Sequence, residues 1–172
     1  ADYSTILDGQ GLYVTRSDDD YYGTFLFENN LCVNNGKNGI NFDRSKGASA
    51  LVRNNTIYFN GVHEIIQDIS QNVEGNPRHG GQKVAGIIAN YVYNVTVVNN
   101  IVVTRFTDYS ALKLNNVDDP FTTDDPNTPI VENANDGTKI ATNNIFVNGT
   151  IAYPGNQVPA NQINIDPLFV NA

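Results

Sequence analysis

Residues 53–61 read RNNTIYFNG: an asparagine pair, a short apolar strand and an Asn-Gly stop. The pair and its strand recur as ENNLCV at residues 28–33, VNNIVV at 98–103 and TNNIFV at 142–147, and the Asn-Gly stop recurs after the first and the last of these. The second asparagine of each pair is residue 30, 55, 100 and 144, so the copies are 25, 45 and 44 residues apart. A recurring unit of this size is typical of a chain built from stacked coils. The first interval fits one coil, and the two longer intervals each fit one coil plus an inserted loop.

A second recurring block has the alternation of a strand with one buried face. It reads GINFD at 39–43, GIIAN at 86–90, ALKLN at 111–115 and QINID at 162–166. One coil then has strands at 40–43, 49–53 and 56–59, a turn at 45–48 and a bend at Asn54-Asn55, where Asn tolerates the left-handed conformation. Like residues should stack into three inward columns: Ile40, Ile87, Leu112 and Ile163; Phe42, Ala89, Leu114 and Ile165; Cys32, Ile57, Val102 and Phe146. Glu28 and Arg53 occupy equivalent positions and should form a cross-strand ion pair.

Composition agrees with an all-β fold. The chain has 172 residues, of which 40% are hydrophobic and only 16% charged, with 14 glycines and no Trp or Met. The length suits a single domain, 1–172. A β-sandwich with turns at similar spacing is the rival architecture, but it does not explain why like residues recur at like positions.

The stretch from Gly39 to Gly61 resembles the repeat of pectate-lyase-like parallel β-helix proteins. The closing DPLFVN at 166–171 is similar to the end of the helix in many secreted bacterial members. The resemblance covers most of Tyr22–Ala172 and implies a right-handed parallel β-helix (β-solenoid) of about five to six three-strand coils with two long loop insertions. Members include polysaccharide lyases and hydrolases, epimerases, phage tailspikes and surface proteins, so the fold alone does not settle the activity.

The beginning of the chain departs from the family pattern, because strand-like sequence starts almost at once, at Thr5–Leu7 and Leu12–Val14. An uncapped end would expose a sheet edge and core side chains. We therefore expect the chain to be the C-terminal part of a longer solenoid, or to have its open coil end covered by another chain. The alternative is that residues 1–23 fold over the end as a cap.

Charge and cysteine content exclude several classes of function. A net charge of −8 and a pI near 4.5 argue against a nucleic-acid partner. The single cysteine, Cys32, cannot form an internal disulfide, and no apolar run approaches the roughly 20 residues of a membrane span. The resemblance to pectate-lyase-like proteins implies a secreted or cell-surface protein whose partner is a polysaccharide.

The outward face of the first strand of each coil is the predicted groove. Its two ladders contain Asn41, Ile88, Lys113 and Asn164 in one row, and Asp43, Asn90, Asn115 and Asp166 in the other. Hydroxyl groups of a polysaccharide would bond to the Asn and Asp side chains. The predicted substrate-binding residues are therefore Asn41, Asp43, Asn90 and Asn115, with His79 from a flanking loop. Polar outer faces are also the default of any solenoid, so a solvated strand face is the alternative.

The first insertion, Val62–Ala85, concentrates basic and acidic side chains and holds both histidines of the chain. Elimination from a uronate needs a base for the proton α to a carboxylate and a cation to neutralise that carboxylate. Similar lyases use Lys or Arg as the base and Ca²⁺ held by Asp and Glu. The resemblance therefore implies Lys113, Lys83, Arg78 and His63 as catalytic candidates, and Asp43, Glu64 and Asp68 as Ca²⁺ ligands.

Other interpretations of these loops remain open. A hydrolase would use paired carboxylates from Asp43, Glu64 and Asp68. A transition-metal site at His63, Glu64 and His79 matches no known spacing. The acidic residues at 118–119 and 124–125 of the second insertion suit either a Ca²⁺ site or a plain surface loop.

Two hypotheses follow from the sequence. The first is a calcium-assisted polyuronate lyase with its groove on the first strands. The second is a non-catalytic extracellular solenoid that acts as a sugar-binding, adhesive or filament-forming module.

Overall fold

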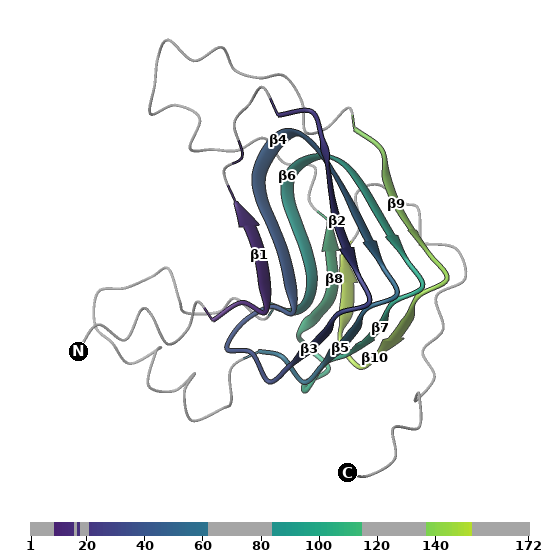
Figure 1. Ribbon diagram of the computed structural model, residues 1–172. Helices are drawn as coiled ribbons and strands as arrows, with labels where there is room; N and C mark the ends of the chain where they lie inside the picture. The colour runs from purple at the N-terminus through teal and green to yellow at the C-terminus, as the bar shows by residue number, and fades with distance from the viewer. Residues whose placement is uncertain (1–8, 16, 18–20, 62–83, 115–136, 153–172) are drawn as a thin grey trace, which may run out of the picture.

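The protein is described by a computed structural model over residues 9–15, 17, 21–61, 84–114 and 137–152 (Figure 1). Within these ranges every regular element is a strand, and every pairing between strands is parallel. No helix in this part of the chain is long and apolar enough to cross a membrane. The strands are β1 (Leu12–Thr15), β2 (Thr24–Glu28), β3 (Leu31–Val33), β4 (Ile40–Arg53), β5 (Thr56–Tyr58), β6 (Val84–Val98), β7 (Ile101–Val103), β8 (Ser110–Leu114), β9 (Lys139–Thr142), β10 (Ile145–Val147) and β11 (Thr150–Ala152).

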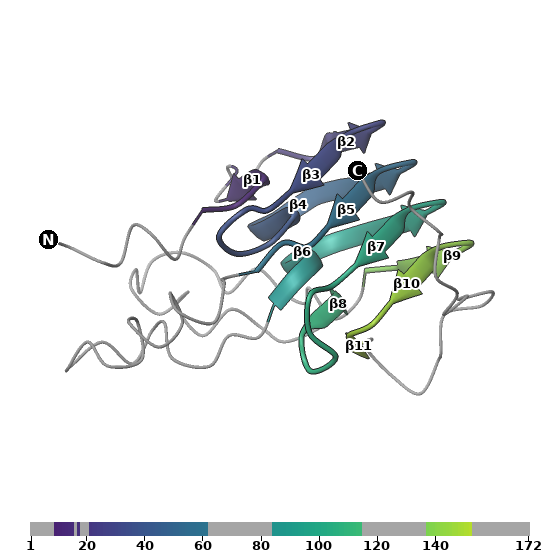
Figure 2. The ribbon, with the colours of Figure 1, turned by 90° about the horizontal axis from the view of Figure 1, so that it is seen from below.

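The strands form two parallel sheets. The larger one has seven strands in the order β1-β4-β6-β8-β11, with β2 also pairing with β4 and β9 with β6. The smaller one has four strands in the order β10-β7-β5-β3. Figure 2 shows successive passages of the chain side by side, from β2 and β3 at one edge to β9 and β10 at the other. This layout is compatible with a β-solenoid, and each passage is called a repeat below.

The two long strands, β4 and β6, bend sharply (Figure 1). The first half of β4 pairs with β1, and its second half pairs with β2. The turn predicted at residues 45–48 is a bend within β4, with a register shift between Ser45 and Ser49. Arg44 has a left-handed φ of 53°, which turns the chain, and the small side chains of Ser45 and Ala48 are buried. The strand is therefore bent where a break was expected.

The core consists of the predicted inward columns. Ile40 stacks on Ile87 and Ile87 on Leu112, while Phe42 stacks on Ala89 and Ala89 on Leu114. In the smaller sheet, Cys32, Ile57, Val102 and Phe146 stand in one register, and all four are buried. The described members of the three columns are thus confirmed, and Ile163 and Ile165 lie outside the described residues.

The two asparagines of each pair have different structural roles, and the first one bends the backbone. The first one takes the left-handed conformation at Asn29, Asn54, Asn99 and Asn143, with φ between 54° and 58°. It turns the chain from the larger sheet into the smaller one, at a cost that Asn tolerates better than most residues. The predicted left-handed bend is confirmed at all four copies.

The second asparagine of each pair belongs to a ladder of amide side chains. Asn55 Oδ1 accepts hydrogen bonds from the backbone N–H of Asn30 at 3.0 Å and from its Nδ2 at 2.9 Å. In the same way, Asn100 Oδ1 accepts hydrogen bonds from the backbone N–H and the Nδ2 of Asn55. Asn144 Oδ1 accepts them from the backbone N–H and the Nδ2 of Asn100. Asn55, Asn100 and Asn144 are buried, so the ladder satisfies polar groups that water does not reach.

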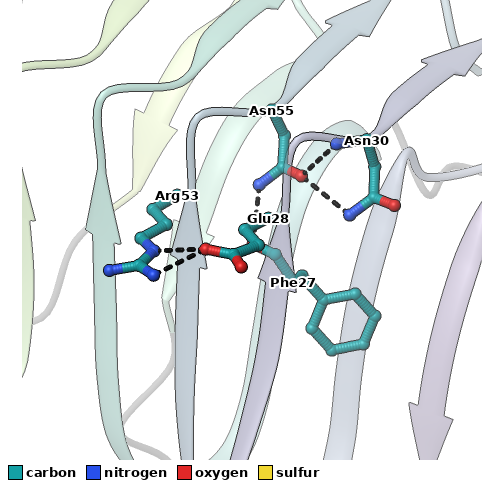
Figure 3. Close-up of polar contacts among 5 residues, drawn as sticks. All are labelled: Phe27, Glu28, Asn30, Arg53 and Asn55. Carbon is teal, nitrogen blue, oxygen red and sulfur yellow. Dashed lines mark hydrogen bonds and ion pairs between the residues drawn. The ribbon is translucent and has the colours of Figure 1, made fainter.

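Figure 3 shows the first step of this ladder beside an ion pair between the same two repeats. Asn55 Nδ2 also donates to the backbone carbonyl of Phe27 at 3.0 Å. Arg53 forms an ion pair with Glu28. The Nε of Arg53 lies 2.7 Å, and its Nη2 2.6 Å, from the same carboxylate oxygen of Glu28. The predicted cross-strand pair is confirmed. Both side chains are partly exposed, so its contribution is at most about 1 kcal/mol.

We expect Asn100→Leu to lower the free energy of unfolding by about 3 kcal/mol or more. Leucine has a similar size but neither donates nor accepts. The substitution removes the acceptor of the buried Asn55 N–H and of its Nδ2, and it takes one donor from Asn144 Oδ1 and from the carbonyls of Val52 and Val98. Urea denaturation followed by circular dichroism measures the loss.

The matched control is Asn99→Gly at the exposed neighbouring position, where φ is 56°. Glycine adopts this conformation readily, so we expect a change below about 1 kcal/mol. Equal losses in the two variants would contradict the assignment of the stability to the ladder.

Candidate functional site

The outward face of the first strands carries two rows of side chains. The parallel register places Tyr13 of β1, Asn41 of β4, Ile88 of β6 and Lys113 of β8 in the first row. The order within it is fixed by the backbone hydrogen bonds between neighbouring strands. The structure thus brings the predicted residues Asn41 and Lys113 to one face.

The second row runs parallel to the first, two residues further along each strand. It contains Thr15, Asp43 and Asn90. All three are on the same face as Asn41, because side chains of a strand alternate with a period of two. The predicted substrate-binding residues Asn41, Asp43 and Asn90 therefore lie together on β4 and β6.

The middle of the first row is not open to solvent. Asn41 is 6% exposed and Ile88 is 2% exposed, although both point away from the core. The Oδ1 of Asn41 accepts no hydrogen bond from any described residue. A buried acceptor in this condition is unusual in a folded protein. Because the atom is closed to solvent, a ligand donor does not reach it in this arrangement.

Asp43 has a cation beside it. Arg44 Nη1 lies 3.5 Å from the Asp43 carboxylate, and both side chains are mostly buried. Arg44 is also the left-handed residue at the bend of β4, so its place is set by the backbone. A metal ion at Asp43 would have to share the carboxylate with this guanidinium.

Lys113 is the fourth of the five residues of β8 and is half-buried, between Ile88 of β6 and Ala152 of β11. Adjacent strands lie about 4.8 Å apart, so two strand spacings, roughly 10 Å, separate the backbone of Lys113 from that of Asn41. Lys113 is the one predicted base among the described residues. Its amine projects from a rigid strand, which is a precise support for a catalytic group.

The remaining predicted site residues lie outside the described ranges. These are His63, Glu64, Asp68, Arg78, His79 and Lys83 of the first insertion, and Asn115. The acidic residues of the second insertion also lie outside them. In the described part of the chain, no three His, Cys, Asp or Glu side chains come together as a metal-binding group.

Lys139 is a residue that the sequence analysis missed. It pairs in register with Val95, an inward position of β6, so it continues the column of Phe25, Ala50 and Val95. Its Nζ donates to the backbone carbonyls of Val92 and Tyr93. Burial lowers the pKa of this amine from 10.5 to about 8. Aligning KIAT at 139–142 with VTVV at 95–98 would have placed a lysine at an inward position.

We expect the free energy of unfolding to rise between about pH 8 and pH 10.5, and Lys139→Met to remove part of this rise. The folded-state pKa is the lower one, so between these values the unfolded chain binds more protons than the folded chain. Raising the pH therefore favours folding. Urea denaturation at several pH values checks this.

Lys37→Met is the control for the pH series, because Lys37 is on the connection between β3 and β4. The rise with pH should be reduced in Lys139→Met relative to Lys37→Met, which loses the same charge at another position. If Lys139→Met and the wild type follow the same curve, the partly buried amine does not contribute to it.

Comparison with known proteins gives no further assignment: no protein-family description, curated protein or solved structure matches this chain. The rows on β4, β6 and β8 are therefore interpreted from their own geometry.

Proposed function

We propose that the chain is a right-handed parallel β-helix protein of the pectate-lyase-like type. Three features support the proposal: parallel pairing throughout, a left-handed Asn at the same place in four repeats, and a buried ladder formed by the following Asn. Each of them repeats at the interval of the sequence pattern. A β-sandwich of antiparallel strands does not account for such a ladder.

The proposed activity is elimination from an acidic polysaccharide outside the cell. The observation that carries it is the position of Lys113 on the same outward face as Asn41, Asp43 and Asn90. A polysaccharide lying across the strands would meet amide and carboxylate groups on β4 and β6 and an amine on β8. Arg78, Lys83 and His63 of the first insertion are proposed to complete the site, with His79 and Asn115 as further sugar contacts.

In this proposal the Lys113 amine, in its neutral form, takes the proton α to the uronate carboxylate. The electron pair of that C–H bond forms a C=C bond as the bond from the β carbon to the glycosidic oxygen breaks. The leaving oxygen receives a proton and becomes the hydroxyl of the released sugar. The other product is an unsaturated uronate, which absorbs in the ultraviolet.

Ca²⁺ is the proposed cofactor, held by Asp43 with Glu64 and Asp68, and when bound it would neutralise the uronate carboxylate. The structure describes only Asp43 of these three, and its carboxylate pairs with Arg44. One carboxylate does not supply the roughly six to eight oxygens that Ca²⁺ takes, so the described residues alone do not fit such a site. The calcium requirement therefore rests on the two residues of the first insertion.

We expect absorbance at about 235 nm, from the unsaturated uronate, to rise when the protein is incubated with one of a panel of polyuronates: pectate, alginate or glycosaminoglycans. Lys113→Ala should lower the rate about 10²- to 10⁴-fold, because the base is removed. A chelator should lower it as well if Ca²⁺ is required.

Lys37→Ala is the control and should keep the rate. Circular dichroism must show that both variants are folded. If the folded protein gives no absorbance on any substrate, with or without Ca²⁺, the lyase assignment is wrong.

The alternative is a non-catalytic sugar-binding, adhesive or filament-forming module. The burial of Asn41 and Ile88 favours it, because much of the first row is closed to a long polymer. Affinity electrophoresis in gels containing the same polysaccharides distinguishes the two functions. Retardation without any absorbance would assign binding alone.

A further inference from the structure

The asparagine ladder has a direction. Each Oδ1 accepts two hydrogen bonds from the asparagine one repeat earlier, so acceptors point toward the N-terminal edge and donors toward the C-terminal edge. Asn30 is the first member in the described chain, and its Oδ1 accepts no hydrogen bond from a described residue. A shorter second ladder repeats this pattern, since Asn35 donates from its backbone N–H and Nδ2 to Asn60 Oδ1. Both ladders thus begin with an acceptor that has no donor among the described residues.

A cavity lies at the same edge. Its volume is about 340 Å³, and its walls are Gly11 and Leu12 at the start of β1, the segment Asn30–Val33, and Asn35. All of these residues belong to the first repeat. One repeat further on, Ile40 and Ile57 are the inward residues of β4 and β5, and both are completely buried. The cavity is therefore the open end of the core.

The first edge of the stack leaves several core residues partly uncovered. Leu12, Val14, Phe25 and Phe27 are only partly buried there, although Cys32 is buried, and the outward Leu31 is 70% exposed. At the last edge Ala141, Asn144 and Phe146 are buried, and Ile151 of β11 is 38% exposed. Figure 2 shows these edges, with β2 and β3 on one side and β9 and β10 on the other.

We propose that the edge of β2 and β3 is a docking site for a strand-bend-strand segment of a partner polypeptide, which adds to the sheets in parallel and carries Asn in line with Asn30 and Asn35. The exposed strand edges supply backbone hydrogen bonds, and partner side chains fill the cavity. The partner Asn residues donate backbone and side-chain N–H groups to Asn30 Oδ1 and Asn35 Oδ1. This inference does not depend on the proposed lyase activity.

Charge and polarity select the partner. A second copy related by a two-fold axis would bring Asn30 Oδ1 against another acceptor, and the opposite end of a copy has its Asn144 already buried. At the position in register with Glu28 a basic residue is favoured, as Arg53 is on the other side. The required motif begins with a basic residue followed by Asn-Asn. Three strand residues come next, then one residue of any type, and then another Asn.

The probe is a fluorescein-labelled peptide with the sequence of residues 49–61, SALVRNNTIYFNG, which has this spacing at Arg53, Asn55 and Asn60. We expect saturable binding to the full chain by fluorescence anisotropy. The peptide with Asn55→Leu and Asn60→Leu should bind about tenfold more weakly or worse, because its side chains then donate no hydrogen bond to Asn30 Oδ1 or Asn35 Oδ1.

Variants of the protein locate the binding. Asn30→Leu should weaken the peptide about tenfold or more, whereas Asn148→Gly, a left-handed position at the far edge, should leave it within about twofold. If Asn30→Leu does not fold, Asn35→Leu takes its place, and it should weaken the binding of the peptide in the same way. Absence of saturable binding, or equal binding of the two peptides, would overturn the proposal. So would concentration-dependent self-association that Asn30→Leu abolishes, because the edge would then belong to a second copy.

Discussion

The fold depends on buried amide groups that hydrogen-bond only to each other and to the backbone. An amide side chain in an apolar interior costs several kcal/mol unless every donor and acceptor has a partner. Asn100 meets this condition: its Oδ1 accepts from Asn55, and its Nδ2 donates to Asn144 and to two backbone carbonyls. A shift of one residue between repeats would leave these groups unpaired. The ladder therefore sets the register of both sheets, because it stands at the bend that joins them.

The register in turn fixes where the outward side chains lie. Because each asparagine is held in line with the next, the inward residues stack in columns and the outward residues stack in rows. Glu28 meets Arg53, and Asn41 stands two strands from Lys113 for the same reason. The direction of the ladder has a second consequence. Only one of its ends offers acceptors, so the two edges of the stack are not equivalent and cannot be occupied by the same kind of partner.

The sequence predicted those features that repeat and missed those that do not. The inward columns, the left-handed Asn and the Glu28–Arg53 pair each follow from equal positions in successive repeats. The bend of β4 was predicted as a turn, because a left-handed Arg44 is not visible in a pattern of apolar residues. Lys139 was missed since the copy that contains it, KIAT, has a charged residue where the other copies have Phe25, Ala50 and Val95.

The burial of the outward rows could also not be predicted from the sequence. Alternation shows that Asn41 and Ile88 point away from the core, but whether an outward side chain is covered depends on residues distant in the chain. The same limit applies to the charged loop residues of the first insertion. Their clustering in sequence does not determine the distances between their side chains, and chemistry at a site depends on those distances.

The spacing of the rows limits how any polysaccharide can use this face. A polymer lying across the strands advances about 4.8 Å for every repeat, so it passes one side chain of each row per repeat. In the first row Asn41 and Ile88 are buried, so on β4 the second-row residue Asp43 is the one within reach. Asp43 on β4 and Lys113 on β8 are two repeats apart. In the proposed function, binding on β4 and chemistry on β8 would therefore act on different units of one polymer.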